Sequence, residues 1–198
     1  MLIVTGTGRS GTSVIATWLK ELGLMDNLTD WVQQNNSGYD TRDVARVNSA
    51  IVLGNDPAMQ SIPAQSEAIR GFQHEIVKDP LFFYGNALNT WLDVRRDFKV
   101  LICLRKFQHV HKSRLRVQQH NLAFDPDKLR MELGKFMSEL LFNEIPYEVI
   151  TFPSFLDSYD EVYGKIKALY PAIEDKVEIE FGREAWESIV KKNLVHYR

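Results

Sequence analysis

The sequence predicts an α/β protein of three layers, in which a central, mostly parallel sheet is flanked by helices. Three observations lead to this prediction. Short apolar segments of strand length alternate with longer segments whose apolar residues recur at helical spacing. A glycine-rich turn joins the first predicted strand to the first predicted helix. Polar residues follow directly after several predicted strands, where the carboxyl ends of parallel strands form the usual ligand-binding edge.

The chain opens with a strand, a glycine loop and a helix. Residues 2–4 are a short apolar run that suits a buried strand. After the loop, residues 14–22 have a helical apolar stripe, and Gly23 is a stop signal. The stripe consists of Val14, Ile15, Trp18, Leu19 and Leu22.

Residues 24–38 read as irregular, because asparagine, serine and glycine are common there. Trp31 and Val32 give this segment apolar surface to bury, so we interpret it as a lid rather than a linker. Beyond it the elements alternate again. Helices are predicted over 41–53, 63–71, 85–95, 109–119, 126–142, 159–170 and 183–192, and strands over 73–77, 99–104 and 147–151. Together they form a single domain over residues 1–198.

Composition narrows the class of protein. An apolar content of 44% with 25% charged residues is typical of a globular domain with a real core. The net charge of −2 gives no overall attraction to nucleic acid, so an anion site has to be local. No apolar run approaches membrane-spanning length, and the N-terminus lacks the pattern of a secretory signal. Cys103 is the only cysteine and no metal-site spacing occurs, so we expect a cytoplasmic protein without a metal.

The glycine loop matches two phosphate-binding patterns. The first is the dinucleotide fingerprint Gly6-x-Gly8-x-x-Gly11, which requires a second strand that ends in an acidic residue about twenty positions later. Asp26 and Asp30 lie in range, but their neighbours do not read as a buried strand. This match is therefore incomplete.

The second pattern is a P-loop, Gly6-x-x-x-x-Gly11 followed by Thr12 and Ser13. Thr12 stands where nucleoside triphosphatases have the lysine that contacts the β- and γ-phosphates. A cation is present earlier in the loop, as Arg9. The sequence thus predicts a P-loop NTPase-like fold whose anion chemistry differs from that of ATP or GTP hydrolysis.

A second anion site is predicted after the strand over 99–104. Arg105 follows this strand directly, and Ser113 lies eight residues later on the predicted helix, where it can point back toward the same pocket. A guanidinium and a hydroxyl form a good cradle for a phosphate monoester. The alternative is that the basic run over 105–116 is a solvated helix face.

These motifs together resemble the P-loop sulfotransferases, in particular their bacterial and carbohydrate-type branch. The loop over 8–13 is similar to the family's 5′-phosphosulfate loop, and the spacing of Arg105 and Ser113 is that of its 3′-phosphate site. The resemblance spans roughly residues 2–170. It also includes the turn Lys78-Asp79-Pro80, the segment Asn36-Ser-Gly-Tyr-Asp40 followed by Val47 and Asn48, and the late strand and helix from Tyr147 to Leu156. The chain departs from the family where Lys106 and Phe107 replace an acidic residue and a proline, and it lacks the lysine–histidine catalytic strand of animal cytosolic members.

The resemblance implies a donor, an acceptor and roles for the matching residues. The donor is 3′-phosphoadenosine 5′-phosphosulfate (PAPS), the product is 3′,5′-adenosine bisphosphate (PAP), and the acceptor is a hydroxyl or amine of a small molecule or carbohydrate, with no metal needed. Arg9 is the cation nearest the sulfuryl group, and Arg105 with Ser113 holds the 3′-phosphate. The loop residues that hold the 5′-phosphosulfate are Gly8, Arg9, Ser10, Gly11, Thr12 and Ser13.

Three further residues are candidates for the catalytic step. Lys78 is expected to reach the sulfuryl oxygens or the acceptor, with an ordinary surface lysine as the alternative. Asp40 and Asp79 are candidates for the general base, although Asp79 also suits a role as a turn cap. The competing functions are a nucleotide-binding or kinase-like P-loop protein, a non-catalytic member of the fold, and a dinucleotide-binding protein. Neither nucleic acid nor a membrane span is expected.

Overall fold

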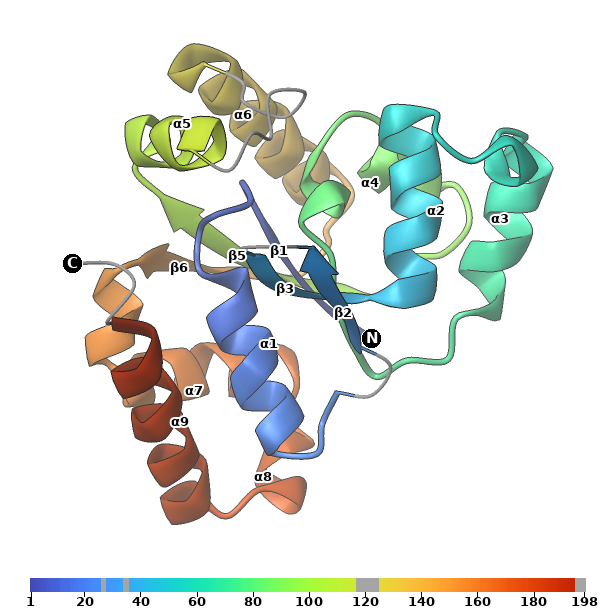
Figure 1. The fold of residues 1–198 in the computed structure, drawn as a ribbon. Coiled ribbons are helices and arrows are strands. Elements are labelled where there is room, and N and C mark those ends of the chain that lie inside the picture. The colour runs from blue at the N-terminus through green and yellow to red at the C-terminus, as the bar shows by residue number, and fades with distance from the viewer. Residues whose placement is uncertain (26–27, 34–35, 117–124, 195–198) are drawn as a thin grey trace.

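The computed structural model describes residues 1–25, 28–33, 36–116 and 125–194, and for residues 28–33, 36–40, 116 and 191–194 it describes the backbone alone. The fold is α/β, with a four-stranded, all-parallel central sheet between two layers of helices, as the sequence predicts (Figure 1). The strands of this sheet lie in the order β4-β1-β5-β6. They are β1 (Leu2–Gly6), β4 (Ile76–Lys78), β5 (Lys99–Arg105) and β6 (Tyr147–Phe152).

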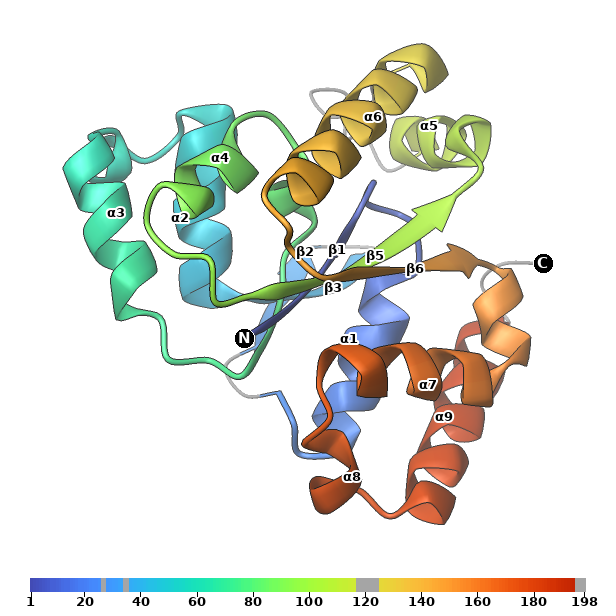
Figure 2. The same ribbon diagram turned by 180° about the vertical axis from the view of Figure 1, so that it is seen from behind.

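Helices cover both faces of the sheet. On one face lie α1 (Thr12–Glu21), α7 (Tyr159–Leu169), α8 (Ile173–Lys176) and α9 (Ile179–Leu194) (Figures 1 and 2). On the other lie α2 (Arg42–Leu53), α3 (Ile62–Gly71), α4 (Ala87–Leu92), α5 (Phe107–Arg116) and α6 (Pro126–Phe142). Short 3₁₀ turns occur at η1 (Pro57–Met59), η2 (Pro80–Phe83) and η4 (Ser154–Asp157).

The two-residue period of the strands divides the core into two clusters. Leu2 and Val4 of β1 point toward the layer of α1, α7 and α9, while Ile3 points toward the layer of α2, α3, α4 and α6. In β5, Leu101 belongs to the first cluster and Ile102 to the second. Burial on both faces explains why these strands read as continuous apolar runs.

Helix α1 is fixed by its predicted apolar stripe. All five residues of that stripe are buried, and Trp18 is fully enclosed. The indole ring of Trp18 packs edge-on against Tyr159 and Trp186, and its Nε1 donates a hydrogen bond to the carbonyl of Gly182 at 2.9 Å. Contacts with α7 and α9 thus hold the helix that follows the glycine loop.

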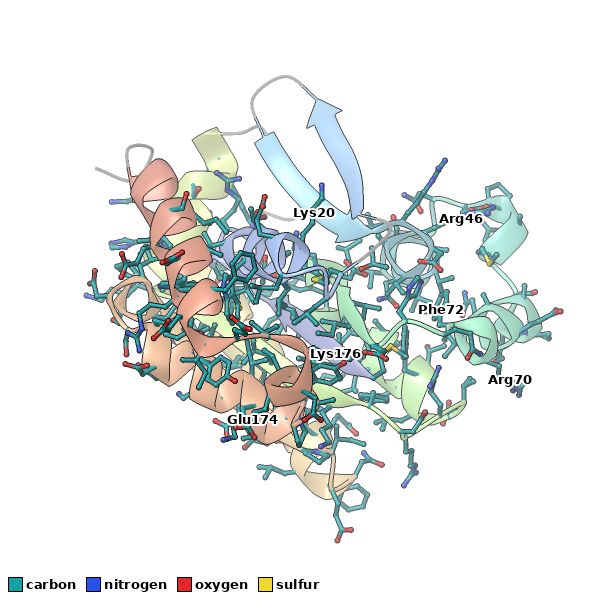
Figure 3. The ribbon with its side chains drawn as sticks, turned by 90° about the horizontal axis from the view of Figure 1, so that it is seen from below. Lys20, Arg46, Arg70, Phe72, Glu174 and Lys176 are labelled. Carbon is teal, nitrogen blue, oxygen red and sulfur yellow. The ribbon has the colours of Figure 1, made fainter. Side chains whose placement is uncertain are left out.

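The prediction that residues 24–38 are irregular is wrong for most of the segment. Residues Leu28–Gln33 form β2 and residues Asn36–Thr41 form β3, an antiparallel pair separate from the central sheet. Gly38 pairs with Trp31 and Ser37 with Val32, so backbone pairing overrides the loop-forming tendency of glycine and serine. Figure 3 shows this hairpin extending beyond the helical layers, next to the helix that carries Lys20.

The C-terminal elements also differ from prediction. Helix α9 begins at Ile179 rather than near residue 183, and the short helix α8 was not predicted. Side chains from this region join distant parts of the chain, since Lys176 and Tyr170 both contact the carboxylate of Glu75. Figure 3 places Lys176 and Glu174 on the side of α8, away from Arg46 and Arg70 on the side of α2 and α3.

Candidate anion-binding site

The loop between β1 and α1 has an unusual backbone. Gly8, Arg9 and Gly11 have φ angles of 65°, 54° and 92°, in the region that favours glycine. For Arg9 this conformation is strained, and such strain concentrates at functional sites. The glycines also allow close packing: a Cβ on Gly11 would lie 2.6 Å from the ring of Phe155. The loop is therefore held tightly in a shape that ordinary residues do not favour.

Helix α1 begins at this loop with its amide groups available. The carbonyl of Gly11 accepts hydrogen bonds from the amides of Val14 and Ile15. Among the described residues, however, no hydrogen bond has the amides of residues 10–13 as donors, and Gly11 provides no side-chain cap. Free amides and the positive end of the helix dipole attract anions.

Two hydroxyl groups of the loop have no hydrogen-bond partner among the described residues. The side-chain oxygens of Thr7 and Ser10 are buried and make no hydrogen bond within the described part of the chain. Buried polar atoms are nearly always paired, so such exceptions need an explanation. These two hydroxyl groups therefore mark the loop as a candidate ligand-binding site.

The structure brings the two predicted anion anchors together. Nε of Arg9 donates a hydrogen bond to Oγ of Ser113 at 3.1 Å, and Nη1 of Arg105 donates one to the carbonyl of Arg9 at 3.3 Å. The guanidinium of Arg105 also lies 4.9 Å from the centre of the Phe152 ring. Residues from β5, α5 and the glycine loop thus form one cationic cluster at the carboxyl edge of the sheet.

Lys78 and Asp79 lie at the same edge, and both are buried, with exposures of 2% and 0%. The backbone amide of Lys78 donates a hydrogen bond to Oγ1 of Thr41 at 3.0 Å, which joins the C-terminal end of β3 to the C-terminal end of β4. Oγ1 of Thr5 donates to the carbonyl of Asp79 at 2.8 Å. The turn after β4 is therefore fastened to the start of the glycine loop.

The carboxylate of Asp79 is engaged inside the protein. It accepts hydrogen bonds from the amide of Leu81 at 2.9 Å and from Nδ2 of Asn48 at 2.7 Å, while Oδ1 of Asn48 accepts from Nε1 of Trp91 at 2.9 Å. This geometry favours the capping role for Asp79 over that of a general base. Asp40 occupies β3 opposite Thr29, and its side chain lies outside the described residues.

Replacing Asn48 by alanine is expected to lower the free energy of unfolding by about 2–4 kcal/mol, because two buried hydrogen bonds are lost and one of them is to a carboxylate. Asn55→Ala is the matched control, since the hydrogen bond that Asn55 donates to Oγ of Ser49 is exposed to solvent. Chemical denaturation of both variants measures the difference. If the Asn48→Ala variant were as stable as the Asn55→Ala variant, the Asn48–Asp79 contact would contribute little to stability.

Arg114 and Tyr84 were not predicted as site residues, yet both contact the loop. Oη of Tyr84 donates to the carbonyl of Thr7 at 2.5 Å, and Arg114 donates to the same carbonyl. The one sequence signal is that Arg114 lies four residues after the buried Val110 and so shares its helix face. An arginine in the basic run gives no hint by itself that its head group is buried.

Three other observations bear on the class of site. Within the described residues there is no group of three or more His, Cys, Asp or Glu side chains placed to hold a metal ion. The helices of that same part of the chain are all too short or too polar to cross a membrane. Cys103 is fully buried in the core, and burial raises the pKa of its thiol, as expected for an inert cysteine.

Comparison with known proteins identifies no relative. No protein-family model matches the chain, no curated protein matches its sequence, and no solved structure matches its fold.

Proposed function

We propose that the protein is a sulfotransferase that moves a sulfuryl group from PAPS to a hydroxyl or amine of a small-molecule or carbohydrate acceptor. The observation that carries this proposal is the contact of Arg9 with both Ser113 and Arg105 beside the open end of α1. PAPS has a phosphate at one end and a phosphosulfate at the other, and two adjoining anion anchors suit that shape. When bound, PAPS supplies the activated sulfuryl group.

Different residues of the loop bind different parts of PAPS. The backbone amides of Ser10, Gly11 and Thr12, with the hydroxyls of Thr12 and Ser13, hold the 5′-phosphate. Arg9 places a fixed positive charge where negative charge develops during transfer. Transfer of this kind depends chiefly on positioning and charge, which a rigid loop provides.

The second anchor holds the 3′-phosphate. Arg105 and Ser113 are fixed there by β5 and α5, and Ser113 can donate its proton to the phosphate while it accepts from Arg9. We assign Lys78 and Asp40 to the acceptor side, and the hydrogen bond from the amide of Lys78 to Thr41, the residue after Asp40, supports this assignment. Of the two carboxylates, Asp40 is our candidate base, because Asp79 is buried and its carboxylate accepts hydrogen bonds from Asn48 and the amide of Leu81. We place the reaction in the cytoplasm.

Specific features argue against the two nucleotide alternatives. A dinucleotide site needs a parallel strand that ends in an acid soon after α1, but Asp30 lies in the antiparallel strand β2. A kinase-like site needs a lysine at position 12 and an acid that holds magnesium, but the chain has Thr12, and β5 ends at Arg105. Asp79 follows β4, and its carboxylate already bonds Asn48 and the amide of Leu81.

Thermal unfolding with PAP, with ATP plus magnesium and with NAD tests the proposal. PAP at a hundred times its dissociation constant is expected to stabilise the protein by about 2.7 kcal/mol, and so to raise Tm by about 5–10 °C. Arg105→Met is expected to lose most of this shift, while Arg46→Met, whose side chain is 57% exposed and pairs with Asp56, keeps it. A shift with ATP or NAD but none with PAP would overturn the proposal.

A further inference from the structure

Arg114 is an almost fully buried arginine beneath the glycine loop. Its side chain is 2% exposed, and its guanidinium carbon lies 5.2 Å from the centre of the Tyr84 ring. Nη2 donates to Oη of Tyr84 at 2.6 Å and to the carbonyl of Thr7. The loop backbone lies directly against it, because a Cβ on Gly8 would be 2.6 Å from Nη2. Only glycine at this position lets the guanidinium come so close.

These contacts fix the orientation of one peptide in the loop. The carbonyl of Thr7 points toward Arg114 and Tyr84, which both donate to it. The peptide between Thr7 and Gly8 is trans, so the amide of Gly8 points to the opposite side. Among the described residues that amide donates no hydrogen bond. By holding the Thr7 carbonyl, Arg114 and Tyr84 therefore orient the Gly8 amide as an unbonded donor on the opposite side of the loop.

Among the described residues, no counter-ion balances the positive charge of Arg114. Nε and Nη1 are buried without hydrogen-bond partners, and no carboxylate of the described residues forms an ion pair with this guanidinium. Glu132 acts electrostatically on Tyr84 but makes no such pair. Burial raises the pKa of Tyr84 to about 12, so its hydroxyl stays neutral and does not balance the charge. A buried cation without a counter-ion is costly to maintain.

We propose, on the basis of the function proposed above, that Arg114 is a further anion-binding residue of the loop. It orients the Thr7–Gly8 peptide for binding, and its buried charge is balanced by the phosphate or phosphosulfate group that the loop holds. The anion and the guanidinium act on each other across the loop backbone, in a region of low dielectric where such attraction is strong. Arg114 therefore contributes to affinity without lining the surface of the site.

The local hydrogen bonds allow a clean test. When methionine replaces Arg114, the hydroxyl of Tyr84 still donates to the carbonyl of Thr7, so neither group loses its last partner. The substitution also removes a buried, unbalanced charge. The free protein is thus expected to be as stable as the wild type or more stable, whereas a purely structural arginine would leave the variant less stable.

The experiment measures binding of PAP and of inorganic pyrophosphate by calorimetry, and unfolding of the free proteins by denaturant. Arg114→Met is expected to weaken both ligands about tenfold or more, with no loss of stability. Arg114→Gln, which is neutral but keeps an amide donor, is expected to weaken them similarly, and it serves if the methionine variant does not fold. Arg114→Lys keeps the charge and is expected to bind more tightly than either.

The possible outcomes separate this inference from the proposed function. If PAP binds the wild type and the neutral variants equally, the role of Arg114 is overturned and the sulfotransferase proposal stands. If pyrophosphate but not PAP binds the wild type, and the neutral variants weaken it, the role of Arg114 stands and the donor assignment falls. If neither ligand binds the wild type, both are overturned.

Discussion

Replacing Arg9 by alanine is expected to lower the rate of sulfuryl transfer by about 10²- to 10³-fold, the usual cost of removing one fixed charge or donor that stabilises a transition state. Arg9 contacts Ser113 and supports Arg105 through its carbonyl, so its head group is held where both anion anchors meet. Steady-state kinetics with PAPS and an accepted hydroxyl or amine measure the loss. The fall is expected mainly in kcat, because the loop amides and Arg105 still bind the donor.

Arg9→Gly is the matched variant, because it removes the same side chain but suits the φ angle of 54° at this position. The glycine variant is expected to be more stable than the alanine variant by roughly 1 kcal/mol, since only alanine retains the left-handed strain. Both are expected to be equally slow. Substantial transfer by Arg9→Gly would show that Arg9 is not the cation nearest the sulfuryl group.

Replacing Gly6 by alanine is expected to lower the free energy of unfolding by roughly 3 kcal/mol. Gly6 ends β1 and pairs with Cys103 of β5. A Cβ on Gly6 would lie 2.1 Å from the carbonyl oxygen of Cys103 and 2.8 Å from Oγ of Ser10. Because the first of these atoms is backbone in the central sheet, it cannot move aside, so β1 and β5 would have to separate.

Gly164→Ala in α7 is the control for that variant. A Cβ on Gly164 would meet no atom within 4 Å, and alanine favours a helix over glycine, so this change is expected to add about 0.5–1 kcal/mol. Denaturant titration of both variants tests the pair. A Gly6→Ala protein as stable as the wild type would mean that the loop and β5 can separate at little cost.

Much of the fold follows from the sequence, because local signals and tertiary packing agree. Helix α6 was predicted from Pro126 to about residue 142 on the basis of its apolar stripe, and it is observed over these residues. In the structure Asp125 also caps its first turn by accepting from the amides of Asp127 and Lys128. The central strands β1 and β5 are buried on both faces, so their apolar runs mark them clearly. In these elements the cap, the period and the burial all point to one structure.

Other elements carry no such signal. The first turn of α9 presents Ile179 and Phe181 at 53% and 54% exposure, so its apolar residues do not follow the pattern of a buried face. The hairpin contains glycine and asparagine, and it forms through pairing between β2 and β3 rather than through strand propensity. Such pairing depends on contacts between two segments, so it cannot be predicted from the residues of either segment alone.

In the candidate site too, some contacts could be predicted from the sequence and others could not. The contact between Arg9 and Ser113 was foreseeable, because parallel strands place their carboxyl ends at one edge and α5 points back toward it. The burial of Arg114 was not, because it depends on Tyr84 and on the close approach of Gly8. The engagement of Asp79 by Asn48 likewise joins residues 31 positions apart in the chain.

The separate hairpin of β2 and β3 has a consequence for how the chain can change in evolution. It forms a two-stranded sheet of its own, whose backbone ladder is separate from that of the strands that hold the glycine loop. Closing a longer hairpin costs little, about 0.6 kcal/mol for each doubling of loop length. Under the function proposed above, the segment can therefore be lengthened over evolutionary time while the central sheet stays intact, which makes it a suitable place for changes in acceptor preference.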